Sequence, residues 1–300
     1  MIDFGIMLPS FDSHQRGEWS LLEAARLTEE VGFNSAWVGD HLSFHPPILE
    51  ALTSLAAVGA VTNSIALGTN VLLLALRQWP LLASQLGTID ALYPDRLILG
   101  VGVGGEHPPE WEAAGVPVRE RGRRVDEGIE VLSSLLAGQP VDHHGPLAPV
   151  RSPRIAPNPG HMLPLVIGGR SDAAIERAAR VADAWIGVWM DPDEVGRHIE
   201  RLTERAEAHQ RARPTPLLMV FTMVDEDESR AKEQSAALFR GQYNMPYEVV
   251  ERWTVTGSTQ RVADTIDRYR QAGVEGFVLS PTGRNSLAQI ERLGLVREQL

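Results

Sequence analysis

Short apolar runs rich in Val, Ile and Leu alternate along the chain with longer stretches whose apolar residues recur at helical spacing. The apolar runs predict eight strands, over Asp3–Leu8, Ser35–Val38, Ile65–Leu74, Arg96–Val103, Pro164–Ile167, Ala184–Val188, Leu217–Val224 and Val274–Leu279. The stretches between them predict helices, over Leu21–Val31, Leu49–Val61, Pro80–Leu92, Val125–Leu136, Ala173–Ala182, Val195–His209, Asp225–Gln242, Ser258–Ala272 and Asn285–Leu293. Ser258 is the expected N-cap of its helix, because a serine oxygen accepts from the unpaired N–H groups of a first turn.

Strands that are apolar on both faces indicate a parallel sheet covered on both sides. Eight strand–helix units in 300 residues therefore predict a (β/α)8 TIM barrel. A doubly wound sheet is the alternative, although it usually has fewer strands. Two segments interrupt the alternation after strands four and seven, Gly138–Met162 and Tyr243–Thr256. They predict insertions within a single domain over residues 1–300, since no linker divides the chain.

The net charge of −11 argues against binding to nucleic acid or to an anionic membrane surface. The chain has no Cys, which excludes disulfides, thiolate metal sites, Fe–S clusters and cysteine nucleophiles. No uncharged apolar run is long enough to span a membrane, and the start MIDFGIML lacks the features of a secretory signal. We therefore expect a cytoplasmic protein.

The end of the second strand carries the ionisable pair Asp40–His41, which is unusual in an apolar context. His41 could act as acid, base or hydrogen-bond donor because histidine titrates near neutral pH, and Asp40 could orient it. Alternatively, Asp40 caps the following turn and His41 makes one backbone hydrogen bond. His45 follows His41 at the spacing of a helical metal pair, but Pro46 and Pro47 oppose a helix here, so we expect no metal site.

Glycines at positions 100, 102 and 105 satisfy the dinucleotide-binding pattern GxGxxG after the fourth strand. That pattern must open a helix, whereas Pro108 and Pro109 follow, and no acidic residue ends a second strand about twenty residues on. We therefore reject a dinucleotide site. These glycines either pack closely inside the barrel or let a flat ligand approach the backbone. We assign Gly104, in the same segment, to the approach of the ligand.

The segment Gly168–Gly169–Arg170–Ser171 follows the fifth strand and precedes a helix. Its glycines expose backbone N–H groups at a helix N-terminus, where the helix dipole favours an anion. Arg170 and Ser171 add donors that suit a phosphate. The alternative is a tight turn capped by Ser171 or Asp172.

Several further segments occur in a characteristic order: Phe4–Pro9, Trp37–His41, Leu67–Val71, Asp95–Gly102, Val116–Gly122, Pro164–Gly169, Asp183–Ile186 and Ala272–Phe277. Each segment is weak by itself, and their order and spacing together are specific. In this order they resemble the bacterial-luciferase-like superfamily of flavin- and deazaflavin-dependent oxidoreductases. The resemblance covers essentially the whole chain.

The resemblance implies a TIM barrel with a tricyclic ring lying across its mouth. It implies a non-prolyl cis peptide bond after the third strand, at Asn70–Val71, that backs the ring. It also implies that Gly168, Gly169, Arg170 and Ser171 hold the cofactor phosphate. The pair Asp40–His41 matches the residues beside the reacting ring in deazaflavin-dependent dehydrogenases.

The sequence departs from the sugar-phosphate dehydrogenases of this superfamily at two positions. His45 stands where they carry a tryptophan, and Gly105 stands where they carry a catalytic glutamate, with Glu106 one place later. We therefore do not transfer the sugar-phosphate substrate. Either His45 and Glu106 line a pocket for a different substrate, together with Trp189 and Trp253, or Glu106 is simply solvated.

The resemblance favours hydride transfer between C5 of coenzyme F420 and a small organic substrate. His41 would then exchange a proton near the reacting carbon, and Asp40 would fix its tautomer. One alternative is an FMN-dependent monooxygenase that takes reduced flavin from a separate flavin reductase, and another is a non-catalytic binding barrel. Tyr243, Tyr247 and Trp253 favour an apolar or aromatic substrate. We expect a homodimer, since dimers are common in the superfamily.

Overall fold

Eight parallel strands close into a barrel in the computed structural model, which describes residues 4–13, 17 and 19–300. In their order around the ring, they are β1 (Phe4–Met7), β2 (Ser35–Val38), β3 (Ala66–Thr69), β5 (Leu97–Gly102), β8 (Leu165–Gly168), β9 (Ala184–Val188), β10 (Thr215–Val224) and β12 (Gly276–Pro281). The ring is complete because β10 pairs with both β9 and β12, and β12 pairs with β1. The predicted (β/α)8 TIM barrel is confirmed, and the predicted strand start at Asp3 lies outside the described residues.

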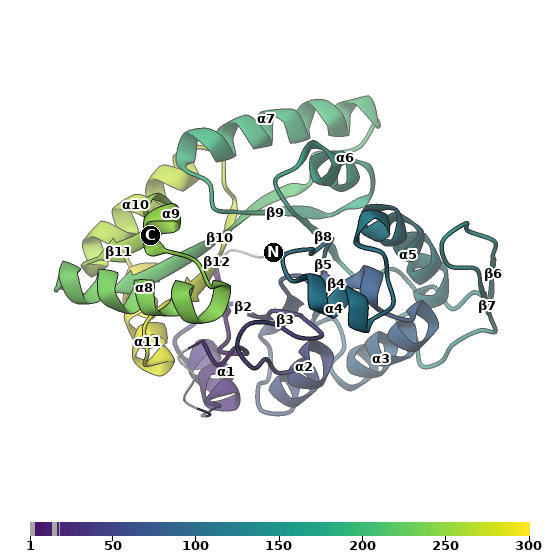
Figure 1. The fold of residues 1–300 in the computed structure, drawn as a ribbon, viewed down its shortest axis with the longest axis horizontal. Helices are drawn as coiled ribbons and strands as arrows, with labels where there is room; N and C mark the ends of the chain where they lie inside the picture. Colours follow the sequence, from purple (N-terminus) through teal and green to yellow (C-terminus); the bar gives the residue numbers. More distant parts are fainter. Residues whose placement is uncertain (1–3, 14–16, 18) are drawn as a thin grey trace.

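Helices surround the ring of strands (Figure 1). The α-helices are α1 (Leu21–Glu30), α2 (Ala51–Gly59), α3 (Trp79–Leu92), α4 (Pro108–Ala113), α5 (Arg121–Leu136), α6 (Asp172–Val181), α7 (Pro192–Ala208), α8 (Glu228–Tyr243), α9 (Tyr247–Val250), α10 (Thr259–Gln271) and α11 (Ser286–Arg297). Short 3-10 helices are η1 (Leu74–Leu76), η2 (Val118–Glu120) and η3 (Glu251–Trp253). Ser258 caps α10 as predicted, because its hydroxyl accepts from the backbone N–H of Arg261 at 3.3 Å. Among the described helices, none combines the length and apolarity needed to cross a membrane.

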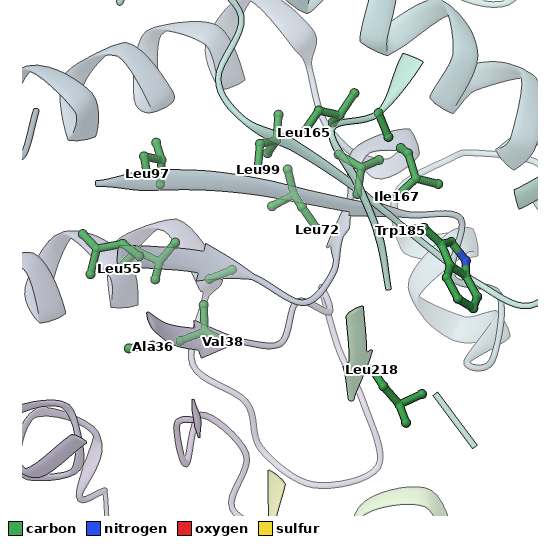
Figure 2. Packing of buried hydrophobic residues seen from close by; sticks show 14 of the residues in the cluster. Ala36, Val38, Leu55, Leu72, Leu97, Leu99, Leu165, Ile167, Trp185 and Leu218 are labelled. Carbon is green, nitrogen blue, oxygen red and sulfur yellow. The ribbon is translucent and has the colours of Figure 1, made fainter. Parts of the chain in front are cut away.

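Side chains of the barrel strands point alternately to two separate apolar layers. On β5, Leu99 joins the outer layer between strands and helices, whereas Ile98 joins the inner layer inside the barrel. On β9, Trp185 lies in the outer layer and Ile186 in the inner one. Figure 2 shows part of the outer layer, where Leu99 and its register partner Leu165 lie side by side. Burial on both faces explains why the strands appear in the sequence as continuous apolar runs.

Trp37 fills much of the inner layer and is completely buried. It lies on β2 between two glycines of the neighbouring strands, Gly5 on β1 and Gly68 on β3. A Cβ atom would lie 2.5 Å from the indole Nε1 at Gly5 and 2.2 Å from the indole Cε3 at Gly68. The two glycines are therefore what allows a tryptophan to fit inside the ring.

The prediction of one continuous third strand over Ile65–Leu74 is wrong. β3 ends before the cis peptide bond Asn70–Val71, and a second short strand, β4 (Leu72–Leu73), then pairs with a later part of β5. The 3-10 helix η1 follows directly. An apolar run cannot distinguish one strand from two because both halves are buried.

Two segments that the sequence leaves without regular structure contain short elements. Between α5 and β8, an antiparallel hairpin of β6 (Val141–His143) and β7 (Val150–Ser152) projects from the barrel (Figure 1). Between β10 and α10, β11 (Thr254–Gly257) follows α8 and α9 and pairs with the end of β10. These strands are three or four residues long, too short for a periodic pattern to be recognised.

Candidate active site

The loops at the carboxyl ends of the barrel strands enclose a cavity of about 280 Å³. This is the end where side chains from different strands meet, and where barrel enzymes place their reactive groups. The sequence-predicted residues that line the cavity are Asp40, His41, Asn70, Val71, Gly104, Glu106, Gly168, Gly169 and Trp189. The predicted residues that do not line it are His45, Arg170, Ser171 and Trp253.

Val71 forms part of the cavity floor, beside the cis peptide bond that the resemblance implied. A Cβ atom at Gly102 would lie 2.2 Å from Val71 Cγ2, and one at Gly168 would lie 2.7 Å from Val71 Cγ1. At Gly100, it would lie 1.9 Å from the Thr69 carbonyl oxygen. Close packing therefore accounts for Gly100 and Gly102, and the glycines leave a floor that a flat ring can approach.

Asp40 is buried at the edge of the cavity, where it holds the loop after β3. One carboxylate oxygen accepts from the backbone N–H of Leu73 at 2.9 Å, and the other pairs with Arg77 at 2.5 Å. Burial lowers the pKa of Arg77, but its ion pairs with Asp40 and Glu50 outweigh burial and raise that pKa above its ordinary value. Both oxygens of Asp40 are thus engaged elsewhere, so the expectation that Asp40 fixes the tautomer of His41 is wrong.

Glu110 is the residue that holds the His41 ring. Its side chain is completely buried, and both carboxylate oxygens lie 3.1 Å from His41 Nδ1. One of them also accepts from the backbone N–H of Leu42 at 3.1 Å. Because an ionised carboxylate only accepts hydrogen bonds, the proton of the neutral ring lies on Nδ1. Nε2, which has no hydrogen-bond partner among the described residues, then presents a lone pair to a ligand.

The interpretation of Pro108 and Pro109 as incompatible with a helix is wrong. For this reason Glu110 is not identified as a site residue from the sequence. Helix α4 begins at Pro108, where a proline is tolerated because the first N–H groups of a helix have no partner within it. The pattern Pro-Pro-Glu is itself a signal for a helix start, since an acidic residue in the first turn complements the helix dipole. The rejection of a dinucleotide site still holds, because β5 belongs to a closed barrel.

The segment after β8 starts helix α6 at Asp172. Ser171 is its N-cap, because the hydroxyl accepts from the backbone N–H of Ala174 at 3.2 Å. Arg170 donates to the Trp189 carbonyl oxygen at 3.0 Å and lies 5.9 Å from the centre of the Trp189 ring. The capping alternative for Ser171 is thus confirmed, and the helix N-terminus still opens beside Gly169 at the cavity edge.

The predicted substrate residues separate into two groups. Glu106 and Trp189 line the cavity, but His45 packs against Phe44 with ring centres 5.0 Å apart, and Trp253 donates its indole N–H to Glu194. Within the described part of the chain, no group of three or more ligating side chains could hold a metal ion.

Aromatic side chains that the sequence does not mark as site residues form one wall of the cavity. Phe11, Phe44 and Phe221 line it together with Tyr243. Burial raises the pKa of Tyr243 above its ordinary value, so this hydroxyl stays protonated at neutral pH. These residues come from segments that are distant in the chain, with Tyr243 at the end of α8, so only the closed barrel assembles the wall.

The sequence profile described as luciferase-like monooxygenase matches residues 2–276. The chain belongs to this family. An uncharacterised protein of Mycobacterium tuberculosis (strain H37Rv) is 38% identical to this luciferase-like chain over 168 residues, 56% of this chain and 58% of the length of that relative. An F420-dependent glucose-6-phosphate dehydrogenase of Nakamurella multipartita is 26% identical over 320 residues, covering 96% of this chain and 93% of that enzyme.

Solved structures share the barrel of this luciferase-like protein. An F420-dependent secondary alcohol dehydrogenase, in complex with an F420–acetone adduct, superposes with a TM-score of 0.84 over 98% of each chain. The two sequences are 20% identical. This likeness establishes the common fold.

Proposed function

We propose that this luciferase-like protein is an F420-dependent oxidoreductase that transfers a hydride between the deazaflavin and a small organic substrate. The glucose-6-phosphate dehydrogenase relative, which aligns with 96% of the chain, supports the cofactor. The observation that carries the proposal is the His41–Glu110 pair at the cavity edge, because hydride transfer at an alcohol carbon also needs a proton acceptor. A homodimeric, cytoplasmic form belongs to the same proposal.

The cavity suits a flat tricyclic ring. The Val71 side chain forms part of its floor, and a side chain at Gly102 or Gly168 would collide with Val71. Asn70, Val71 and Gly104 would hold the ring, and Gly168, Gly169, Arg170 and Ser171 would hold the phosphate at the N-terminus of α6. When bound, F420 donates or accepts a hydride at C5 of its ring.

His41 handles the proton that accompanies the hydride. In the oxidation of an alcohol, Nε2 accepts the hydroxyl proton as the hydride leaves the carbinol carbon, and in the reverse direction it returns that proton. Glu110 keeps the ring in place through Nδ1 and stabilises the positive charge that the ring then carries. Asp40 and Arg77 hold the adjacent loop in position.

Titration of the purified chain with F420, and separately with oxidised and reduced FMN, tests the proposal. The fluorescence or absorbance of each cofactor reports binding. We expect saturable binding of F420 at micromolar or lower concentration, and weaker binding of both forms of FMN. A preference for reduced FMN would contradict the proposal and favour a monooxygenase supplied by a separate reductase. Binding of neither cofactor would favour a non-catalytic barrel.

A Gly168→Ala variant tests whether the glycine-bordered floor holds the ring. The added Cβ would lie 2.7 Å from Val71 Cγ1, and we expect F420 affinity to fall by about tenfold or more, because overpacking typically costs about 1–3 kcal/mol. Gly196→Ala is the matched control in α7, where the Cβ would come within 3.7 Å only of the Ala272 carbonyl oxygen. Equal loss of affinity in both variants would remove Gly168 from the cofactor site.

A further inference from the structure

Aromatic side chains from four separate segments form one connected surface of the cavity. Tyr243 at the end of α8 is at its centre. Its ring lies 5.8 Å from Phe44, 5.7 Å from Trp189 and 6.0 Å from Phe221, measured between ring centres and in edge-to-face geometry. Such a surface packs against an apolar or aromatic body, and its ring faces also attract cations.

The charged side chains on the cavity surface are acidic. Among the described residues that line it, none is Lys or Arg, and the carboxylates are Asp40 and Glu106. Asp40 is held in an ion pair with Arg77, whereas Glu106 makes no hydrogen bond or ion pair with the part of the chain that the structure describes. Glu106 and Tyr243 line the same cavity, and after burial the charge of Glu106 is a further cause of the raised pKa of Tyr243.

Besides Arg77, two arginines lie near this region without lining the cavity. Arg170 donates to the carbonyl oxygen of Trp189 and packs over the Trp253 ring, 5.7 Å from its centre. Arg121 lies beside Gly105, donates to the Val118 carbonyl oxygen at 3.0 Å, and does not line the cavity. Because no Lys or Arg lines the cavity, and Arg170 belongs to the site proposed for the cofactor phosphate, a phosphate or carboxylate on the substrate would meet the Glu106 charge without a Lys or Arg on the cavity surface to pair with.

We propose that the substrate is an apolar or aromatic compound that carries no phosphate or carboxylate, and that Glu106 selects it by accepting a hydrogen bond from its hydroxyl or ammonium group. This inference rests on the proposed function, since it names the substrate class of the same cavity. It separates this chain from its glucose-6-phosphate dehydrogenase relative, whose name gives it an anionic substrate. Glu106 is then a specificity residue, while His41 moves the proton.

Four phenyl compounds of similar size test the charge preference: 2-phenylethanol, 2-phenylethylamine, phenylacetate and phenyl phosphate. Their binding to the full chain is measured calorimetrically, with and without F420. We expect the alcohol and the amine to bind at least tenfold more tightly than both anions. Anions that bind as tightly as the alcohol, or a series in which no compound binds, would overturn the inference.

Glu106→Gln links the preference to this carboxylate. We expect the discrimination against anions to fall severalfold in this variant, because the amide keeps the size and removes the charge. Glu112→Gln is the matched control, since this exposed carboxylate on α4 does not line the cavity. An unchanged preference in Glu106→Gln would contradict the inference.

The cofactor titration separates the two proposals. If F420 fails to bind while the order of the phenyl compounds holds, the hydride-transfer function is wrong and the substrate class stands. If F420 binds while the anions bind best, the function stands and the substrate class is wrong.

Discussion

At the scale of single residues, the orientation of His41 comes from Glu110, which is 69 positions away in the chain. The buried carboxylate accepts from the His41 ring and from the backbone N–H of Leu42, so it fixes both the ring and the loop that carries it. Its conformation in turn depends on α4, which starts at two prolines. Glu110 is therefore a positioning residue, and His41 is the group expected to touch the substrate.

Substitutions at His41 and Glu110 distinguish a role in catalysis from a role in F420 binding. We expect His41→Ala to lower turnover by about 10²–10⁴-fold, the usual contribution of general acid–base catalysis, while the Kd for F420 stays nearly constant. Glu110→Gln keeps the shape but removes the charge, and we expect turnover about 10–100-fold lower with F420 affinity retained. Steady-state kinetics and F420 titration of the same preparations measure both quantities.

The matched control for Glu110→Gln is Glu112→Gln, on the exposed side of the same helix, which should leave turnover unchanged. If His41→Ala weakens F420 binding as much as it lowers turnover, His41 is a cofactor-binding residue and its catalytic role is wrong. Addition of imidazole is a further test. Free imidazole restores part of the turnover of His41→Ala only if the side chain that was removed acted as a proton acceptor.

At the scale of elements, one carboxylate joins α1 to the turn between α2 and β3. Glu29 accepts from the backbone N–H groups of Asn63, Ser64 and Ile65, at 2.9, 2.7 and 3.0 Å. Burial acts to raise the pKa of Glu29, but these hydrogen bonds outweigh it and lower the pKa to about 2. The ionised carboxylate thus holds three consecutive N–H groups in place at the start of a barrel strand.

This clamp predicts a pH-dependent loss of stability. The pKa of Glu29 is 4.5 in its ordinary state and about 2 in the fold, so its contribution is complete above pH 4.5 and disappears as pH falls towards 2. We expect Glu29→Gln to reduce the free energy of unfolding by about 1–2 kcal/mol at pH 7, after allowance for solvent screening. Denaturant unfolding at several pH values measures the difference between variant and parent. A difference that persists undiminished at pH 2.5 would show that ionisation of Glu29 is not its source.

At the scale of the whole molecule, the barrel closes where the last strands meet the first. β12 lies between β10 and β1, and one cluster of buried apolar residues includes both Phe4 and Val296. Neither end of the ring can bury its apolar face until the other is in place. We therefore expect the described barrel to unfold as one unit, in line with a single domain over residues 1–300.

Calorimetry tests this expectation and the cofactor together. We expect one melting transition for the chain alone, and an increase in Tm of several degrees when F420 is present at 100 times its Kd, which stabilises by about 2.7 kcal/mol. Two resolved transitions would contradict the single unit. One transition that F420 leaves unmoved would contradict F420 binding to the folded state.

The sequence by itself determined the features that depend on neighbours along the chain. Alternation of apolar runs and helical stretches predicted the barrel, because strand and helix periods repeat within a few residues. Helix starts followed from local chemistry as well, as Ser258 shows. The resemblance further placed the cis peptide bond at Asn70–Val71 and brought Asp40, His41, Gly168 and Gly169 to one region, which the cavity confirms as a common location.

Only the tertiary structure decided which side chains meet. Asp40 and Arg77 are 37 positions apart and Glu110 is 69 from His41, so no local period relates them. The resemblance assigned His45 to the pocket, at the position of a tryptophan in related dehydrogenases, whereas the fold turns it towards Phe44 and outside the cavity. Side-chain pairing at the mouth depends on which strand ends are adjacent after the ring has closed, and that geometry is set by the whole barrel.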